Sequence, residues 1–209
     1  MEEKITYFEQ SGNANTEETL SLALQRAKDR GIQKIVLAST RGDTAKLFAA
    51  KLAGSNIKMI VVPHQYGFGP EGRQRFPKEL VTELERQGHH VYFGTMLFHT
   101  EGFYSNNTPH LMANLLRTFC QGMKVAVEIL FMSTNAGLVA KGENVVVVSG
   151  TGKGADTAIV AIAAPTTALG DFHITEIICK PLQTRQRPPP PEGREATVPQ
   201  TVPNTPRPR

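Results

Sequence analysis

Three short apolar runs in this chain show no alternation of polar and apolar residues. They are Ile35–Ser39 (IVLAS), Ile57–Pro63 (IKMIVVP) and Asn144–Ser149 (NVVVVS). Strands with one exposed face alternate, whereas the strands of a parallel sheet are covered by helices on both faces. With the helical patterns between them, these runs predict a three-layer α/β/α sandwich that contains a mainly parallel sheet.

Further strands are expected at Lys4–Phe8, His90–Phe93, Thr157–Ala163 and Ile174–Cys179. Only residues 150–156 separate the strand at Thr157 from the one before it, and this leaves no room for a crossover helix. These two strands must pair antiparallel, so the expected sheet is mixed.

Helices are expected where apolar residues recur at helical spacing. They begin at Asn15 or Thr16, at Thr44, after Pro77, after Asn107 or Thr108, and at Met123, and they end near Gly31, Gly54, Gly88, Gly122 and Gly137. Residues 95–107 are expected to form a loop.

The helix that is expected to end near Gly122 carries four apolar residues at helical spacing: Leu111, Leu115, Leu116 and Phe119. Cys120 belongs to the same apolar pattern. It is interpreted as an inert core thiol, although the alternative of a nucleophile stays open.

Composition divides the chain into two parts. Residues 1–182 have the length and apolar content of a single domain, whereas residues 183–209 contain eight prolines and five arginines. A segment with so few apolar residues cannot offset the entropy of ordering, so the tail is predicted to be disordered. It also accounts for most of the net charge of +4.

Several classes of function are not expected. The chain has no apolar stretch long enough for a membrane span, and no basic face in residues 1–182 that suggests nucleic acid. Its six histidines form no cluster with metal-ligand spacing, so no metal is expected. Two cysteines in apolar surroundings indicate a reducing compartment, and a cytoplasmic location is therefore predicted.

The glycine-rich sequence GTGKG at 150–154 is typical of an anion-binding loop. It is not a dinucleotide fingerprint or a nucleotide-binding P-loop, because it joins two strands and Lys153 is followed by Gly154. Two interpretations remain: a nest of backbone N–H groups with Lys153 beside it, or a hairpin turn whose glycines only permit positive φ.

A second candidate segment runs from Ser39 to Thr44, where a buried strand leads directly into a helix. The helix N-terminus offers free N–H groups and a positive dipole at the carboxyl edge of the sheet. The alternative is an ordinary helix cap, in which the segment from Ser39 to Thr44 bonds the first turn.

Taken together, these motifs resemble the C-terminal domain of pyruvate kinase, and more closely a stand-alone family of archaea and bacteria that is similar to this domain. The resemblance covers roughly residues 3–181, and its motifs are NTEETL (15–20), ASTRGDTA (38–45), QGMKVAVEILFM (121–132), GLV (137–139), GTGKGADTAIV (150–160) and EIICKP (176–181). The segment TEGFYSNN (100–107) departs from the pattern.

The resemblance implies a function in ligand binding. Pyruvate kinase chemistry belongs to a separate barrel domain, so this chain is not expected to act as a kinase. Relatives in the stand-alone family bind flavin mononucleotide (FMN), which makes a phosphorylated small molecule, and FMN first, the expected ligand. A homo-oligomer is expected by analogy with the pyruvate kinase domain.

The predicted phosphate-binding residues are Asn15, Thr16, Ser39, Thr40, Arg41, Gly42, Asp43, Thr44, Gly150, Thr151, Gly152, Lys153 and Gly154. A flat ring would contact His64, Tyr66 and Phe68, unless these residues only form a surface turn. No catalytic residue is assigned.

Two questions remain open at the level of sequence. Glu128 is a carboxylate within an apolar run, so it needs either a structural hydrogen-bond partner or a role in the site. The alternatives to a binding domain are a flavin-dependent oxidoreductase and an interaction subunit that is tethered by the tail at 183–209.

Overall fold

The computed structural model describes residues 2–69 and 72–182, and the predicted disordered tail at 183–209 lies outside them. The strands are β1 (Thr6–Phe8), β2 (Lys34–Ala38), β3 (Lys58–Val62), β4 (His90–Val91), β5 (Asn144–Ser149), β6 (Thr157–Ile162) and β7 (His173–Pro181). The α-helices are α1 (Thr16–Asp29), α2 (Asp43–Leu52), α3 (Lys78–Arg86), α4 (Glu101–Tyr104), α5 (Thr108–Arg117) and α6 (Gln121–Asn135). Short 3-10 helices occur at η1 (Asn13–Asn15), η2 (Leu97–His99) and η3 (Thr166–Asp171).

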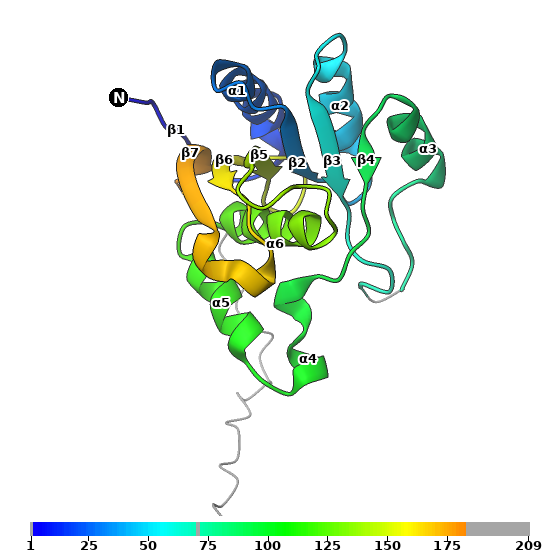
Figure 1. Cartoon of the computed structure of the whole chain (residues 1–209), viewed down its shortest axis with the longest axis vertical. Coiled ribbons are helices and arrows are strands. Elements are labelled where there is room, and N and C mark those ends of the chain that lie inside the picture. The colour runs from blue at the N-terminus through cyan, green and yellow to red at the C-terminus, as the bar shows by residue number, and fades with distance from the viewer. Residues whose placement is uncertain (1, 70–71, 183–209) are drawn as a thin grey trace, which may run out of the picture.

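The strands form one seven-stranded sheet in the order β1-β7-β6-β5-β2-β3-β4. Every neighbouring pair is parallel except β5–β6 and β6–β7, because β6 alone runs in the opposite direction. Helices α1, α2 and α3 lie on one side of the sheet, and α5 and α6 lie on the other (Figure 1). The expected α/β/α sandwich with a mostly parallel mixed sheet is therefore confirmed.

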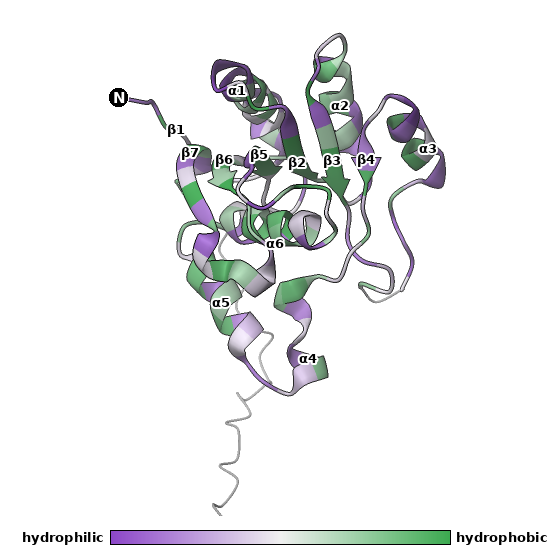
Figure 2. Cartoon of the chain, in the orientation of Figure 1, coloured by the Kyte–Doolittle hydropathy of each residue, from purple (hydrophilic) through white to green (hydrophobic). Residues whose placement is uncertain are grey.

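Both faces of the central strands are buried, as their uniformly apolar sequences predict. Along β2, Ile35 and Leu37 pack in one core cluster with Phe48 of α2, whereas Val36 packs in a second cluster with Leu130 of α6. Burial of one such side chain contributes about 1.5–3 kcal/mol. Apolar residues are concentrated in the strands and on the inner sides of the helices (Figure 2). No helix in the described part of the chain has the length and apolar character that crossing a bilayer requires.

The region before α6 differs from the prediction in two ways. Residues 95–107 are not a continuous loop, because η2 and α4 form within them. In addition, α5 ends at Arg117 instead of continuing to Gly122. The break occurs because Cys120 is the N-cap of α6, and its Sγ accepts a hydrogen bond from the Met123 N–H at 3.3 Å. Cys120 is buried, but it starts a helix and does not lie inside one.

The apolar residues of α5 are also placed differently from the expectation. Leu111 and Leu115 are 64% and 68% exposed, and Phe119 is 50% exposed. The helix packs through Ala113, which lies in a small cluster with Phe131 of α6, and through the half-buried Leu116, which contacts the same cluster. Three of the four apolar residues of the pattern therefore lie on the surface, and Leu116 packs inward as expected.

A candidate ligand-binding cavity at the carboxyl edge of the sheet

A cavity of about 420 Å³ lies where β2 and β3 end. Its walls come from the segments that follow these two strands, from the β5–β6 loop and from one face of α6. Ligands of open α/β sheets bind at this edge, and small-molecule sites have volumes of about 300–1,000 Å³. The two segments that the sequence singles out therefore face the same space.

The structure brings most of the predicted site residues to this cavity. Those that line it are Thr16, Ser39, Thr40, Arg41, Asp43, Thr44, Gly150, Gly152, Lys153 and Gly154, with His64 and Phe68 of the expected ring contacts. Asn15, Gly42, Thr151 and Tyr66 are not among its lining residues.

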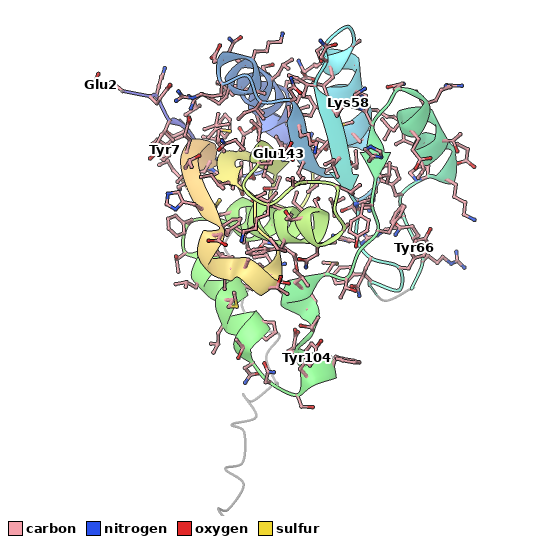
Figure 3. All side chains as sticks on the ribbon, viewed as in Figure 1. Glu2, Tyr7, Lys58, Tyr66, Tyr104 and Glu143 are labelled. Carbon is pink, nitrogen blue, oxygen red and sulfur yellow. The ribbon has the colours of Figure 1, made fainter. Side chains whose placement is uncertain are left out.

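Each of these four residues has another role or position. The Asn15 side-chain amide donates to the Gln10 carbonyl at 2.7 Å, and the Thr151 N–H donates to Asp156 at 3.1 Å. Tyr66 is 60% exposed on the loop after β3 (Figure 3). Gly42 is buried against α3, as described below.

The conformation of the β5–β6 loop is held by the carboxylate of Asp156, which is fully buried. Its Oδ2 accepts hydrogen bonds from the backbone N–H groups of Gly12 at 2.8 Å and Thr151 at 3.1 Å. Its Oδ1 accepts from the Thr157 hydroxyl at 2.8 Å. A charged acceptor with three donors fixes the loop strongly, because charge-assisted hydrogen bonds are stronger than neutral ones.

The start of α1 is joined to the same loop through Thr16. Its hydroxyl donates to the Asn13 carbonyl at 2.8 Å and accepts from the Ala155 N–H at 3.0 Å. Gly154 has φ +75°, and a Cβ at this position would overlap Thr16 Oγ1 and the backbone of Asn13. Glycine is therefore required here both for the backbone angle and for close packing.

The Ser39–Thr44 segment serves as a helix start and as a cavity wall at the same time. The Ser39 hydroxyl accepts from the Ala45 N–H at 3.4 Å, which is the capping role that the sequence left open. Gly42 adopts φ +91°, and a Cβ there would overlap the Leu80 side chain of α3. The N-terminus of α2 is consequently held against the cavity, and its positive dipole end faces this space, although the Ala45 N–H is already bonded to Ser39.

Charge in the cavity is mostly positive. Arg41, Arg75, Lys124 and Lys153 line it, against the carboxylates of Asp43 and Glu128. Arg41 and Lys153 are exposed on the two turns that meet there. Together with the helix N-termini, this distribution favours an anionic ligand.

One side of the cavity contains a buried ion pair. Lys124 and Glu128 are one turn apart on α6, their side chains are only 2% and 3% exposed, and Lys124 Nζ contacts Glu128 Oε2. Glu128 Oε1 also accepts from the Phe98 N–H at 2.8 Å and contacts His99 Nδ1 at 3.3 Å. The Glu128 carboxylate thus joins α6 to η2.

The same contacts set the protonation of the pair. Burial on its own raises the pKa of Glu128, but the hydrogen bonds from His99, Lys124 and Phe98 outweigh it and lower this pKa. Burial lowers the pKa of the Lys124 amine, and the attraction of Glu128 offsets this only in part. Glu128 is therefore held as a carboxylate in the cavity wall.

His64 lies near His99 in the cavity, and the ring of Phe68 contacts both. His64 Nε2 is 3.4 Å from Thr40 Oγ1, and its Nδ1 is 3.2 Å from Arg75 Nη2. Phe68 packs edge-on against both imidazoles, with ring centroids 4.6 Å from His64 and 5.3 Å from His99. Burial, followed by the charge of Arg75, lowers the pKa of His64 and keeps this ring neutral.

Sequence reasoning missed several lining residues: Asn13, Arg75, His99, Gln121 and Lys124. Lys124 could have been found, because it precedes Glu128 by four residues in an apolar helix and both must share one face. His99 and Arg75 lie on irregular segments, where no periodicity shows the direction of a side chain. The sequence left open whether Glu128 has a structural hydrogen-bond partner or a place in the site. In the structure it has such partners and also lines the cavity.

The sequence pattern of the family described as "Pyruvate kinase, alpha/beta domain" matches residues 17–162. The chain belongs to this family. The matched range of this pyruvate kinase alpha/beta domain includes α1 except for Thr16, together with α2, α6 and the β5–β6 hairpin, and therefore most of the residues that form the cavity.

Two solved structures are similar to the pyruvate kinase alpha/beta domain described here. One is a pyruvate kinase from Cryptosporidium parvum, with 15% identity and a TM-score of 0.39. The other is Cryptosporidium parvum pyruvate kinase in complex with ADP, with 16% identity and a TM-score of 0.37. Each match covers 71% of this chain and 23% of the other, so the chain spans about a quarter of the length of these enzymes.

Proposed function

We propose that this domain binds a phosphorylated small molecule in the cavity, with FMN as the ligand. The observation that carries the proposal is the meeting of two turns, Ser39–Thr44 and 150–154, at one cavity. Each turn offers backbone N–H groups, and Arg41 and Lys153 add positive charge beside them. A phosphate dianion fits a site of this kind.

The remainder of the cavity supports a flat ring as the other part of the ligand. Its lining includes Phe68, Met96, Val125, Ile129 and Met132, which offer apolar surface. His64 and His99 supply polar atoms next to it. An apolar cavity with a few directed polar groups is typical of cofactor sites, and FMN combines a ring with a terminal phosphate.

The test compares FMN with riboflavin, which lacks the phosphate. We expect the flavin fluorescence of FMN to be quenched when FMN is titrated with the protein. The titration should give a higher affinity for FMN than for riboflavin. The double charge reversal Arg41→Glu and Lys153→Glu should weaken FMN binding at least tenfold and leave riboflavin nearly unchanged. Both residues are exposed, so the variant should fold.

Lys46→Glu is the matched control, because Lys46 is exposed on α2 but does not line the cavity. Its FMN affinity should equal that of the wild type. Equal affinity of the wild type for FMN and riboflavin would exclude the phosphate site. Replacement of Gly42 is not a suitable test, because a side chain there disrupts the packing against Leu80.

We also propose that the domain self-associates through the exposed face of α4 and α5. Leu111, Leu115 and Phe119 follow one another at four-residue intervals, and Phe103 and Tyr104 of α4 are 83% and 63% exposed. Such apolar patches mark interaction sites. Native mass spectrometry should show a homo-oligomer that Leu115→Glu dissociates, and a monomeric wild type would contradict this.

A further inference from the structure

The hydrogen-bond partners of the two cavity histidines favour opposite tautomers of the neutral ring. Arg75 is always a donor, so His64 Nδ1, 3.2 Å from Arg75 Nη2, must accept. The neutral His64 ring therefore has its proton on Nε2, which faces Thr40 Oγ1 at 3.4 Å. Both nitrogens of this imidazole are thus occupied by protein partners.

His99 has the reverse arrangement. Its Nδ1 lies 3.3 Å from Glu128 Oε1, and an ionised carboxylate can only accept. When the His99 ring is neutral, its proton is therefore on Nδ1, and Nε2 has a free lone pair. Among the described residues, no hydrogen bond to His99 Nε2 is present, although the side chain is 29% exposed and lines the cavity.

The groups behind Glu128 keep this arrangement in place. The carboxylate accepts from the Phe98 N–H at 2.8 Å and contacts Lys124 Nζ, so it is supplied with donors on both oxygens. Lys124 is 1% exposed and is a fixed counter-charge. A carboxylate that is held in this way orients an imidazole and fixes its tautomer, as in other carboxylate–histidine pairs.

We propose that His99 Nε2 accepts a hydrogen bond from a ring N–H of the bound ligand, with Glu128 and Lys124 as positioning residues. This inference rests on the proposed phosphate site and narrows its ligand class. The ligand is then a phosphate-bearing planar heterocycle with an imide or lactam N–H on the part remote from the phosphate. FMN belongs to this class, because its ring carries an imide N–H.

The binding test uses FMN and its analogue with a methyl group on the imide nitrogen, titrated by calorimetry at pH 8. The wild type should prefer FMN by about tenfold, which corresponds to about 1.4 kcal/mol, the worth of one well-placed hydrogen bond. His99→Phe keeps a ring of similar shape but has no acceptor, so it should bind both flavins equally. Equal affinities in the wild type would overturn the proposal.

The variant His99→Gln distinguishes a hydrogen bond accepted by residue 99 from packing of the His99 ring against the ligand. Its amide oxygen can take the place of Nε2, so this variant should retain part of the preference for FMN. The loss of all preference in His99→Gln, with a wild type that still discriminates, would assign the effect to ring packing and overturn the hydrogen bond.

A second measurement does not depend on any ligand. Long-range 1H–15N spectra of the 15N-labelled full chain at pH 8 report which nitrogen of each histidine is protonated, and His99→Phe assigns its signals. We expect Nδ1–H at His99 and Nε2–H at His64. A proton on His99 Nε2 would overturn the proposal. If neither flavin binds, FMN is excluded as the ligand. The spectra then decide by themselves whether His99 Nε2 is free to accept a hydrogen bond.

Discussion

The Asp156 carboxylate accepts a hydrogen bond from the Gly12 N–H at 2.8 Å, across 144 positions of the chain. This contact joins the segment before α1 to the β5–β6 loop. Because Asp156 is fully buried and also accepts from the Thr151 N–H and the Thr157 hydroxyl, the glycine loop has a defined shape before any ligand arrives.

Asp156→Ala should destabilise the domain and weaken the proposed phosphate site. The half-buried N–H groups of Gly12 and Thr151 would lose their acceptor. A fully buried donor that loses its partner costs about 1–3 kcal/mol, and these two should each cost less. Urea denaturation should therefore show a lower free energy of unfolding. Asp156→Asn retains one acceptor oxygen, so its free energy of unfolding should decrease less than that of Asp156→Ala. If Asp156→Ala were as stable as the wild type, this role of Asp156 would be contradicted.

Gly154→Ala should be far more costly than Gly137→Ala. Both glycines have nearly the same backbone angle, φ +75° and φ +74°. A Cβ at Gly137 meets nothing within 4 Å, whereas one at Gly154 overlaps Thr16 and Asn13. Gly137→Ala should therefore cost only the left-handed penalty of about 1–2 kcal/mol, as measured by urea unfolding. Equal losses in the two variants would mean that the packing against α1 is not tight.

The buried pair of Lys124 and Glu128 should show strong coupling. Glu128→Leu leaves an uncompensated buried ammonium and should cost about 3–5 kcal/mol, whereas Lys124→Met combined with Glu128→Leu should be much closer to the wild type. A double-mutant cycle measured by urea unfolding gives the interaction energy. Additive effects of the two substitutions would show that the pair is not coupled.

His89 should make the domain less stable in mild acid. Its Nδ1 accepts from the Met59 N–H at 3.2 Å, so the folded state needs the neutral ring, and burial lowers its pKa below 6.5. The unfolded state then binds a proton first as the pH falls through 6.5, and the free energy of unfolding decreases from that point downward.

His89→Asn is the matched variant, because its Oδ1 can accept from Met59 but does not titrate. We expect its unfolding free energy to change less between pH 7 and pH 5 than that of the wild type. His64, whose pKa is also lowered, contributes in the same direction and should leave a residual slope. An identical pH dependence in His89→Asn would remove His89 as a cause.

Both cysteines should be unreactive in the folded domain. Burial raises the pKa of the Cys179 thiol to about 12, and Cys120 is 1% exposed at the start of α6. Thiolate is the reactive form, so neither residue should react with a thiol-specific disulfide reagent at pH 8 until urea is added. Fast labelling of Cys120 in the native protein would contradict this prediction and support the alternative that Cys120 is a nucleophile.

The strands and most helices could be predicted because their signals are local. A uniformly apolar run such as Val145–Val148 indicates a strand that is buried on both faces, and the short connection to β6 requires antiparallel pairing. In a mainly parallel sheet β2 and β5 are expected to end at the same edge, and their parallel pairing places both turns there. The convergence of Ser39–Thr44 with 150–154 was therefore within reach of the sequence.

Other features depend on tertiary packing that no local pattern records. The interruption between α5 and α6 depends on the cap by Cys120, a residue type that seldom caps helices. The direction of His99 depends on Glu128, 29 residues later. Gly42, predicted as a ligand contact, is instead required for the approach of α3, because only the fold brings Leu80 to it.

The sheet edge formed by β1 and β7 joins the first and the last strand of the domain. β1 pairs with β7, so Thr6 lies opposite Cys179, and the first strand of the domain has its partner only once the last strand of the domain has been made. A chain truncated after β6 would leave β6 with an unpaired edge, a template for pairing between molecules. Loss of the first eight residues would likewise uncover β7. The two ends of the domain thus protect each other from aggregation.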